Sequence, residues 1–490
     1  MQHRPMQPAT TLFTAWILLC AGLVSSAPVE FPDTHAGQRA HEVVDLMNLG
    51  DAEAAKEYIE NRYAPSFKDA FPMAQHLSLF KMTGRMFGQL DLRQVAESSE
   101  DEIKTILQAS SGEWVHLHIQ VEPNDPHRVL NMGIMLGDPP EGWSEEDESA
   151  ASAAAKDVPF SNYDELNAHI RGLTERNEFS GVVLVAKDGK ILFHKAYGMA
   201  SKNFKVPIQL DTKFNIGSLN KLFTSVAVSQ LAEQGKLAFD DKLGSHLEGF
   251  SKDAAEKVTI RHLLQMRSGW GDYWGNETYL STWSRLRTVD DYMAFLKDVP
   301  LGFEPGTRTE HSNTSFEILG AIVEKVSGQD YYDYIRQNVY VPAGMTNTDS
   351  YDRDGPADNL AVHYTDLNPA DPVGEGYRWT NTYMLPSRGT PAGGGYSTTE
   401  DLLKFDIALR EHKLLNPKHT NFYTRRYEGG LDDEFQPPKR PMMAAGGAAG
   451  LNSLLGIDLK NGYTVVVLSN YDMPIAIEIG RDIFKMLKTE

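Results

Sequence analysis

Cysteine is almost absent from this chain, which contains a single one, Cys20, among 490 residues. Cys20 lies in the apolar run TLFTAWILLCAGLV, which follows His3 and Arg4 and precedes small residues up to Ser26. The run is shorter than the roughly 20 residues that a membrane-spanning helix needs, so this layout predicts a secretory signal peptide over residues 1–26. The expected product is secreted or periplasmic and has no stable membrane anchor after cleavage. The loss of Cys20 would exclude disulfides, thiolate catalysis and cysteine metal sites.

Basic residues are also in deficit, since 47 Lys and Arg face 67 Asp and Glu for a formal net charge of -20. Nucleic acids and anionic lipids are bound by basic surfaces, so this charge argues against both as main partners. The sequence has no His, Asp and Glu spacing typical of a metal site and no phosphate-binding loop. We therefore expect neither a metal nor a cofactor.

The length predicts two domains, because one hydrophobic core rarely serves a chain of this size. Residues 37–140 combine helical spacing of apolar residues with later alternating segments, which indicates a small α+β domain. Residues 141–158 are rich in Glu, Ser, Ala and Pro and read as an acidic linker. In the first domain, helices are expected at 40–49 and 51–63, and strands at 113–122 and 128–136.

The remaining residues, 159–490, begin and end with a predicted β-hairpin. The first hairpin covers 181–198 and turns at Asp188-Gly189, and the second covers 453–470 and turns at Asn461-Gly462. A helix is expected to follow over 473–487. Strands at both ends with helices between them predict one antiparallel sheet in which the two ends of the domain meet.

The segment FNIGSLNKLFTSV places Ser218 three residues before Lys221 in a run with no other charge. A helix from about Ser218 to Gly235 would bring the two side chains together on one face. Burial of this apolar helix would lower the pKa of Lys221 and let the amine take the proton of Ser218. Two other readings stay open: about one or two Ser-x-x-Lys matches arise by chance in such a chain, and a lysine stem can extend to solvent.

Four blocks of sequence identify a family resemblance. They are DTKFNIGSLNKLFTSVAVSQLAEQGKLAFDDKL, VTIRHLLQMRSGWGDYW, PGTRTEHSNTSFEILGAIVEKVSGQDYYDYI and PAGGGYSTTEDLLKFDIAL. Residues 160–490 thereby resemble the serine hydrolases of the class C β-lactamase and D-alanyl-D-alanine carboxypeptidase superfamily. The resemblance implies an α+β, β-lactamase/transpeptidase-like fold over 159–490. Residues 37–140 resemble the NTF2-like module that precedes such hydrolases in some exported bacterial proteins.

The resemblance implies acyl transfer through a covalent acyl-enzyme. Ser218 matches the family's nucleophile, and Lys221 matches the lysine that activates it. The family's Tyr-x-Asn motif corresponds to residues 311–313, where Asn313 matches the contact to the lysine and the substrate amide. His311 replaces the tyrosine that usually shuttles protons. An imidazole can perform this relay, or it can merely fill the space of the phenol, and both readings stay open.

The family's third motif begins with Lys or His, and the matching position here is Ala444. The missing cation argues against penicillins or D-alanyl peptides as good substrates, because that cation helps to hold a substrate carboxylate. Gly446 and Gly447 follow, and the N–H of Gly447 is expected to form an oxyanion hole with the N–H of Ser218. The alternative for these glycines is a turn or a tightly packed strand.

The sequence therefore predicts an exported serine hydrolase that cleaves an ester or amide of a small acyl or peptide substrate. One alternative is a binding protein that kept the cleft and lost turnover, which the departures at His311 and Ala444 favour. Another is a true carboxypeptidase or β-lactamase, which Ala444 disfavours. Trp270, Tyr273 and Trp274 are candidates for the rim of the cleft or for the core. No chemistry is expected in the N-terminal module.

Overall fold

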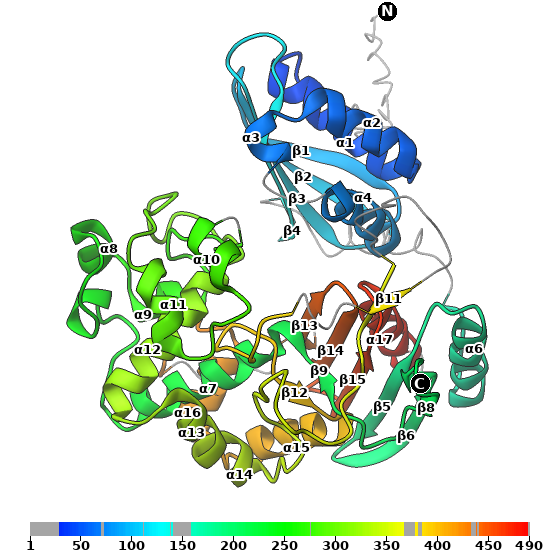
Figure 1. Cartoon of the computed structure of the whole chain (residues 1–490), viewed down its shortest axis with the longest axis vertical. Coiled ribbons are helices and arrows are strands. Elements are labelled where there is room, and N and C mark those ends of the chain that lie inside the picture. Colours follow the sequence, from blue (N-terminus) through cyan, green and yellow to red (C-terminus); the bar gives the residue numbers. More distant parts are fainter. Residues whose placement is uncertain are drawn as a thin grey trace, which may run out of the picture.

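The computed structural model describes residues 29–69, 73–110, 112–137, 139–140, 158–274, 276–366, 378–380, 385–432, 438 and 441–488. The predicted signal peptide and all but the last residue of the predicted linker lie outside these ranges. The described residues form an N-terminal α+β unit above a larger unit that combines a sheet with many helices (Figure 1). Within them, no helix has the length and the apolar character needed to cross a bilayer.

The N-terminal unit is a four-stranded antiparallel sheet in the order β1-β2-β3-β4, packed against helices. The two helices and two strands expected from periodicity are confirmed as α1, α2, β3 and β4. The sequence analysis did not predict β1, β2 or the second long helix, α4. The bounds are α1 (His35–Leu49), α2 (Ala52–Arg62), α3 (Pro65–Lys68), α4 (Met73–Phe87), β1 (Leu90–Ser98), β2 (Glu102–Ala109), β3 (Trp114–Val121) and β4 (Val129–Leu136).

A hydrophobic core of its own holds this unit together. Val43 and Met47 of α1 are buried against Leu107 and Leu117 of the sheet. Along β3 the buried residues alternate with half-buried ones, so one face of the sheet is apolar and the other is polar. The helices of this unit pack on the apolar face, and the polar face is not covered by these helices. The resemblance to NTF2-like modules stays a prediction.

The larger unit contains a five-stranded antiparallel sheet in the order β13-β14-β15-β5-β6. The first two strands of this unit, β5 and β6, therefore share one sheet with the last three, β13, β14 and β15, as predicted. Both predicted hairpins are confirmed, with Gly189 and Gly462 at positive φ in their turns. The predicted C-terminal helix is α17. The bounds are β5 (Gly181–Lys187), β6 (Lys190–Tyr197), β13 (Met442–Ala448), β14 (Leu451–Ile457), β15 (Tyr463–Ser469) and α17 (Ile475–Leu487).

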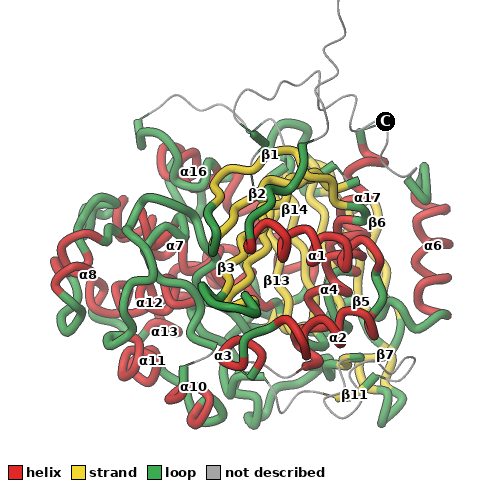
Figure 2. Tube along the Cα trace, turned by 90° about the horizontal axis from the view of Figure 1, so that it is seen from above, coloured by secondary structure: helices red, strands yellow, loops and turns green. Residues whose placement is uncertain are grey.

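Helices cover both faces of this sheet. Val183 and Val185 of β5 pack with α17 and with α6 (Tyr163–Glu175), whereas Val182 and Leu184 belong to the core of the helical region. Seen from above, α6 lies on one side of the sheet and the helical region, including α7 and α12, on the other (Figure 2). This two-sided burial explains why β5 and β15 read as continuous apolar runs.

The helical region lies between β6 and β13 in the chain. It contains the two helices, α7 and α12, that carry the predicted site residues. Its helices are η1 (Gly217–Leu219), α7 (Asn220–Glu233), η2 (Leu243–Ser245), α8 (Lys252–Lys257), α9 (Ile260–Leu264), α10 (Glu277–Thr282), α11 (Val289–Leu296), α12 (Asn313–Ser327), α13 (Tyr331–Ile335), η3 (Arg336–Tyr340), α14 (Val341–Ala343), α15 (Thr399–Arg410) and α16 (Pro417–Thr424). Its short strands are β7 (Met199–Ser201), β8 (Val206–Pro207), β9 (Phe214–Asn215), β10 (Tyr364–Thr365), β11 (Trp379–Thr380) and β12 (Tyr396–Ser397).

Polar contacts join the two units on the side of α17. Lys81 of α4 donates a hydrogen bond to Asp366 at 2.7 Å, and Arg481 of α17 donates one to the carbonyl oxygen of Met86 at 3.1 Å. Ile477 packs against the cores of both units. The N-terminal unit is therefore docked on the larger one.

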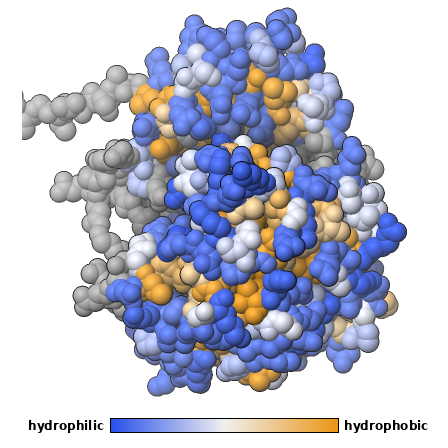
Figure 3. Space-filling model, turned by 90° about the vertical axis from the view of Figure 1, so that its left-hand side faces the viewer, coloured by the Kyte–Doolittle hydropathy of each residue, from blue (hydrophilic) through white to orange (hydrophobic). Residues whose placement is uncertain are grey.

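On the side that carries α8 and α10, hydrophobic surface gathers near the middle of a mostly hydrophilic face (Figure 3).

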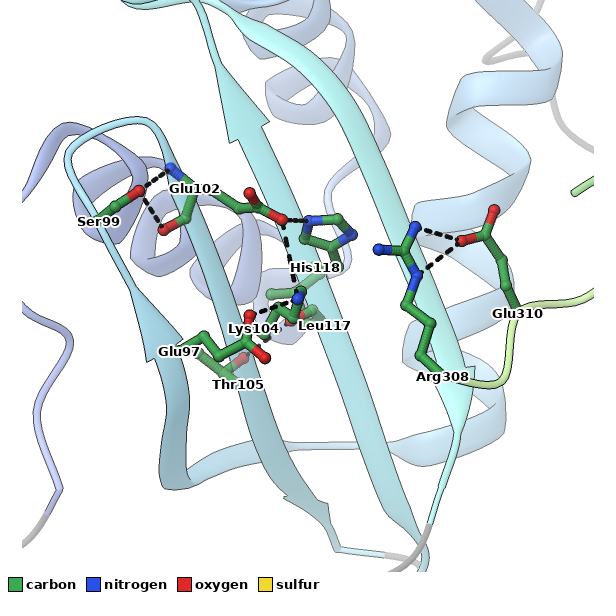
Figure 4. Close-up of polar contacts among 9 residues, drawn as sticks. All are labelled: Glu97, Ser99, Glu102, Lys104, Thr105, Leu117, His118, Arg308 and Glu310. Atoms are coloured by element: carbon green, nitrogen blue, oxygen red, sulfur yellow. Dashed lines mark hydrogen bonds and ion pairs between the residues drawn. The ribbon is translucent and has the colours of Figure 1, made fainter. Parts of the chain in front are cut away.

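The polar face of the N-terminal sheet lies beside the segment that leads into α12 (Figure 4). On the sheet, Nε2 of His118 and Oε1 of Glu102 are 2.7 Å apart. Across from them, Arg308 forms an ion pair with Glu310 at 2.9 Å. Burial lowers the pKa of His118, and the charge of Arg308 acts in the same direction. The N-terminal sheet thus reaches the residues that directly precede His311.

Candidate active site

Ser218 lies in the turn that opens the helix carrying Lys221. Gly217 adopts a positive φ of 51°, and the chain then passes through the short helix η1 directly into α7. The predicted helix is confirmed, with its end at Glu233 and Gly235 at a positive φ of 69°. Ser218 is half-buried, and most of α7 is buried on every side. The serine therefore lies at the N-terminal end of a buried helix, where the helix dipole stabilises negative charge.

Lys221 is held by three oxygen atoms in the interior. Its side chain is only 6% exposed, so it does not extend to solvent. Its Nζ atom donates to Ser218 Oγ at 2.9 Å, to Asn313 Oδ1 at 2.6 Å and to the carbonyl oxygen of Ala392 at 2.6 Å. The amide oxygen and the carbonyl oxygen can only accept. In the neutral amine these two oxygen atoms accept hydrogen bonds from both N–H groups. The nitrogen lone pair is then free to accept a hydrogen bond from the Ser218 hydroxyl.

The surroundings of Lys221 favour loss of its proton. Burial lowers the pKa of its ammonium group to about 8, although the carboxylates of Asp272 and Glu317 act in the opposite direction. A substantial share of the protein therefore carries neutral Lys221 in the mildly alkaline range. In this form the amine can accept the proton of Ser218 as a general base.

Asn313 is presented to Lys221 by the first turn of α12. Ser312 caps this helix by accepting a hydrogen bond from the backbone N–H of Ser315 at 3.0 Å. The backbone N–H of Asn313 donates to Asp272 Oδ1 at 2.7 Å, which fixes the start of the helix against the loop before α10. The side-chain amide of Asn313 consequently points to α7, where its oxygen meets the amine.

His311 forms a pair with Asp272. Its Nδ1 atom lies 2.8 Å from Asp272 Oδ2, and half of the histidine side chain is exposed. Burial raises the pKa of Asp272, but the hydrogen bond and charge of His311 and the N–H of Asn313 outweigh this, so the net shift is downward. Asp272 is then ionised at neutral pH, and when His311 is neutral its Nδ1–H can donate to this carboxylate, so that Nε2 is left to accept a proton. This is the tautomer that a proton relay requires.

Asp272 and Glu317 are polar neighbours of the site that the sequence analysis missed. Glu317 is fully buried one turn after Asn313 on α12, and Tyr273 donates a hydrogen bond to it at 3.0 Å. Burial raises the pKa of Glu317 to about 7. Of the three aromatic residues considered for the rim, Trp270 and Tyr273 are buried, whereas Trp274 is 36% exposed. Asp272 lies in the segment SGWGDYW, and its place in that motif was the sequence signal that could have identified it.

Gly446 and Gly447 lie on β13 against the backbone of the Ser218 turn. A Cβ atom on Gly446 would lie 2.8 Å from the backbone nitrogen of Ser218, and one on Gly217 would lie 2.9 Å from that of Gly447. These separations are closer than real side chains allow, so the close approach requires glycine. Ser453 of β14 fixes it further by donating to the carbonyl oxygen of Ile216 at 2.7 Å. The strand β13 is tightly packed here, as the alternative for these glycines predicted. It also brings the backbone nitrogens of Ser218 and Gly447 to the site.

Ala444 lies two residues before Gly446 on the same face of β13. Its methyl group is half-buried and packs at the edge of the hydrophobic core. The position expected to hold a cation therefore faces the site and carries none. Across the described residues, no group of three or more His, Cys, Asp or Glu side chains could hold a metal ion.

The geometry brings together the residues that acyl transfer needs. The hydroxyl of Ser218 touches a buried amine, and the backbones of Ser218 and Gly447 meet beside it. Asn313 lies against the amine and His311 lies at the neighbouring helix start. An activated hydroxyl beside paired N–H groups can attack a carbonyl carbon and stabilise the resulting oxyanion. The fold and this site define the class of serine hydrolases that use a Ser-Lys pair.

Comparison with known proteins places the chain in a family. Residues 166–487 match the family model described as Beta-lactamase. Penicillin-binding protein 4* of Bacillus subtilis is 31% identical over 328 residues, which are 61% of this chain and 69% of that protein. Esterase EstB of Burkholderia gladioli is 28% identical over 320 residues, which are 59% of this chain and 78% of that protein.

Solved structures agree with these matches. The penicillin-binding protein from Bacillus halodurans is 30% identical, has a TM-score of 0.57, and is matched over 65% of this chain and 99% of its own. The chain belongs to the beta-lactamase family and is a serine hydrolase of the superfamily that includes the penicillin-binding proteins. The predicted family and the predicted β-lactamase/transpeptidase-like fold are thereby confirmed.

Proposed function

We propose that this protein is an exported hydrolase that forms an acyl-enzyme on Ser218 with small ester or amide substrates. One observation carries the proposal: the amine of Lys221, shielded from water, lies 2.9 Å from the Ser218 hydroxyl. In the proposed reaction Lys221 takes the proton of Ser218 while Oγ attacks the substrate carbonyl. The N–H groups of Ser218 and Gly447 stabilise the oxyanion, and His311 passes a proton to the leaving group.

Esters and amides of small acyl groups are the substrates we favour over penicillins. A substrate carboxylate would find a methyl group at Ala444 where a cation is expected, so binding through that carboxylate is weakened. Among the relatives, one is named an esterase and another a penicillin-binding protein, so the family includes both kinds of name. The lack of a cation at Ala444 supports the choice of small esters and amides.

Covalent labelling of Ser218 tests the proposal. A fluorophosphonate probe is expected to modify Ser218 in the wild type, as identified by mass spectrometry of the labelled peptide. The Ser218→Ala variant should lose the label, while Ser225→Ala on the same helix should keep it. Lys221→Met should slow labelling by about 100-fold or more, because it removes the general base. A wild-type protein that is never labelled would instead favour the binding protein.

Export is the second part of the proposal and rests on the sequence of residues 1–26. Expression in a bacterial host followed by mass spectrometry of the intact protein tests it. A product that begins near Ala27 in the periplasm or medium supports cleavage. A cytoplasmic product that retains Cys20 would contradict it.

A further inference from the structure

Glu317 is a buried acid that the proposed reaction does not yet use. Its side chain is 0% exposed in the middle of α12. Oε1 accepts a hydrogen bond from the Tyr273 hydroxyl at 3.0 Å. Oε2 is buried without a well-directed hydrogen bond among the described residues, although Thr390 and the backbone of Ala392 lie close enough to lower the pKa of the carboxyl. Burial of a carboxylate costs free energy unless hydrogen bonds or an opposite charge offset the loss of water. An ionised carboxyl at this position therefore needs a positive charge nearby.

The nearby charge is the amine of Lys221. Asn313 and Glu317 are four residues apart on α12 and therefore share one face of the helix. Asn313 accepts a hydrogen bond from Lys221 Nζ at 2.6 Å, and the ring centroid of Phe316 lies 5.5 Å from the same atom. The face of α12 that carries Glu317 is thus the face that contacts Lys221. In accord with this placement, each of the two groups shifts the pKa of the other toward its charged form.

The other titratable groups that face Glu317 are phenols from four segments. Burial raises the pKa of each phenol, and the charge of Glu317 adds to the shift, so all are neutral at physiological pH. Asp272 is the other negative charge that acts on the same amine, and its effect on the pKa of Lys221 is the larger of the two. Lys221 is therefore the cation that faces Glu317 within the described part of the chain. The phenols belong to Tyr273, Tyr279, Tyr292, Tyr331 and Tyr332.

We propose that Glu317 is the counter-ion of Lys221, a positioning residue that stabilises the ammonium formed when Ser218 gives up its proton. The proposal rests on the function proposed above. In that step the O–H bond of Ser218 breaks, its proton forms a new N–H bond on Lys221, and Oγ bonds to the carbonyl carbon while the C=O electron pair moves to oxygen. The step creates a positive charge on an amine that is shielded from water. A fixed carboxylate on the helix face that contacts the amine lowers the energy of that charge without any reorganisation.

The pH profile of a Glu317→Gln variant tests this role. Activity rises with pH as Lys221 loses its proton, so the acid limb of kcat/KM reports the pKa of Lys221. Removal of the Glu317 charge should lower this pKa from about 8. We expect the acid limb to move down by at least about half a pH unit and the plateau to fall several-fold, because a less basic amine accepts a proton less readily. Glu324→Gln, two turns further along α12, is the matched control and should leave the limb in place.

A folded Glu317→Gln protein with an unmoved acid limb would overturn the proposal and leave Glu317 as a buried hydrogen-bond partner of Tyr273 and its neighbours. If this variant does not fold, or if Ser218 proves inert, the reciprocal measurement decides. Isotope-labelled glutamate side chains followed by NMR should show one carboxyl that titrates near pH 7 in the wild type. Its pKa should rise in Lys221→Met, because the coupling acts equally in both directions. An unchanged titration in Lys221→Met contradicts the counter-ion role, whatever the enzyme does.

Discussion

The amine of Lys221 shows how strongly one side chain depends on its environment. An exposed lysine would stay protonated and could not act as a base at neutral pH. Here burial lowers its pKa to about 8, and the oxygen atoms of Asn313 and Ala392 hold the two N–H groups that the neutral form retains. The hydroxyl of Ser218 takes the remaining direction around the nitrogen. Reactivity and orientation thus come from the same few contacts.

At the same scale, His311 can be tested as a proton relay. The change His311→Phe keeps a ring of similar size and removes the pair with Asp272. If the imidazole passes a proton to the leaving group, turnover of an ester with a poor leaving group should fall by about 100-fold. Hydrolysis of p-nitrophenyl acetate, whose leaving group needs no proton, should fall much less. His246→Phe, which removes a similar histidine pair with Asp241 away from the site, is the control; equal losses for both esters would make His311 a spacer.

A second histidine, His363, makes the free energy of unfolding depend on pH. Burial lowers the pKa of His363 from 6.5 to about 4, so the folded protein keeps this ring neutral. Below pH 6.5 the unfolded chain binds a proton that the folded chain refuses, and stability is lost as the pH falls toward 4. For His363 alone this amounts to about 2 kcal/mol between about pH 7.5 and about pH 5.

Urea unfolding of the wild type and of His363→Leu at these two pH values measures the contribution of the ring. The variant should lose less stability than the wild type on acidification, because its side chain has no proton to bind. Equal losses in the two proteins would contradict a buried neutral histidine. The comparison uses the difference between the pH values, so a constant cost of the substitution cancels.

Among the secondary-structure elements, β13 is the one that we expect to select substrates. Its glycines allow the strand to meet the Ser218 turn, and Ala444 occupies the same face two residues earlier. The strand therefore brings backbone donors to the site but no positive charge. The helix α12 carries Asn313 and Glu317, one turn apart, on the face that contacts Lys221.

Restoration of a cation on β13 should change selectivity. In the Ala444→His variant we expect kcat/KM for a carboxylate-bearing ester to rise about tenfold relative to a neutral ester of the same size, because a charged hydrogen bond becomes available. The ratio of the two rate constants is the measurement. Ala445→His, on the opposite face of the same strand, is the matched control. An unchanged ratio in Ala444→His would show that position 444 does not contact the substrate.

In the whole molecule, the N-terminal unit lies against two segments that lead to elements of the site. On one side Lys81 binds Asp366, whose backbone N–H binds Asp472, and Asp472 in turn accepts from the N–H of Gly450 in the turn after β13. On the other side the charge of Arg308, three residues before His311, reaches His118 of the N-terminal sheet. The two units therefore meet around the elements that carry the site.

Arg481 offers a test of this docking. It donates hydrogen bonds from α17 to Met86 and Glu113 of the N-terminal unit. Because hydrogen bonds from a charged group contribute about 1.5–3 kcal/mol, Arg481→Ala should speed amide hydrogen exchange in α4 by at least about tenfold. Arg93→Ala removes contacts within the N-terminal sheet and should leave exchange on α17 unchanged. Unchanged exchange in α4 of Arg481→Ala would show that other contacts hold the units together.

Local chemistry made part of this fold predictable. Asp188-Gly189 and Asn461-Gly462 favour two-residue turns, and continuous apolar runs flank them, so both hairpins followed from neighbouring residues. The strands β1 and β2 were not predicted, since exposed and half-buried residues dominate β1 and give it a weak apolar pattern. Its pairing with β2, with two register shifts, is a property of the sheet and not of either segment.

The sequence by itself determined the family, the Ser218–Lys221 spacing and the helix that brings these two side chains together, because residues three apart on a helix are neighbours. It could not supply Asp272 or Glu317 as partners, since they come from segments 39 residues or more from the side chains that they act on, His311 and Lys221. Only the tertiary structure decided that Lys221 is closed off from water and that α12 sets an acid beside it. Both effects arise from packing between distant segments, which sets the local dielectric and the charge around the amine.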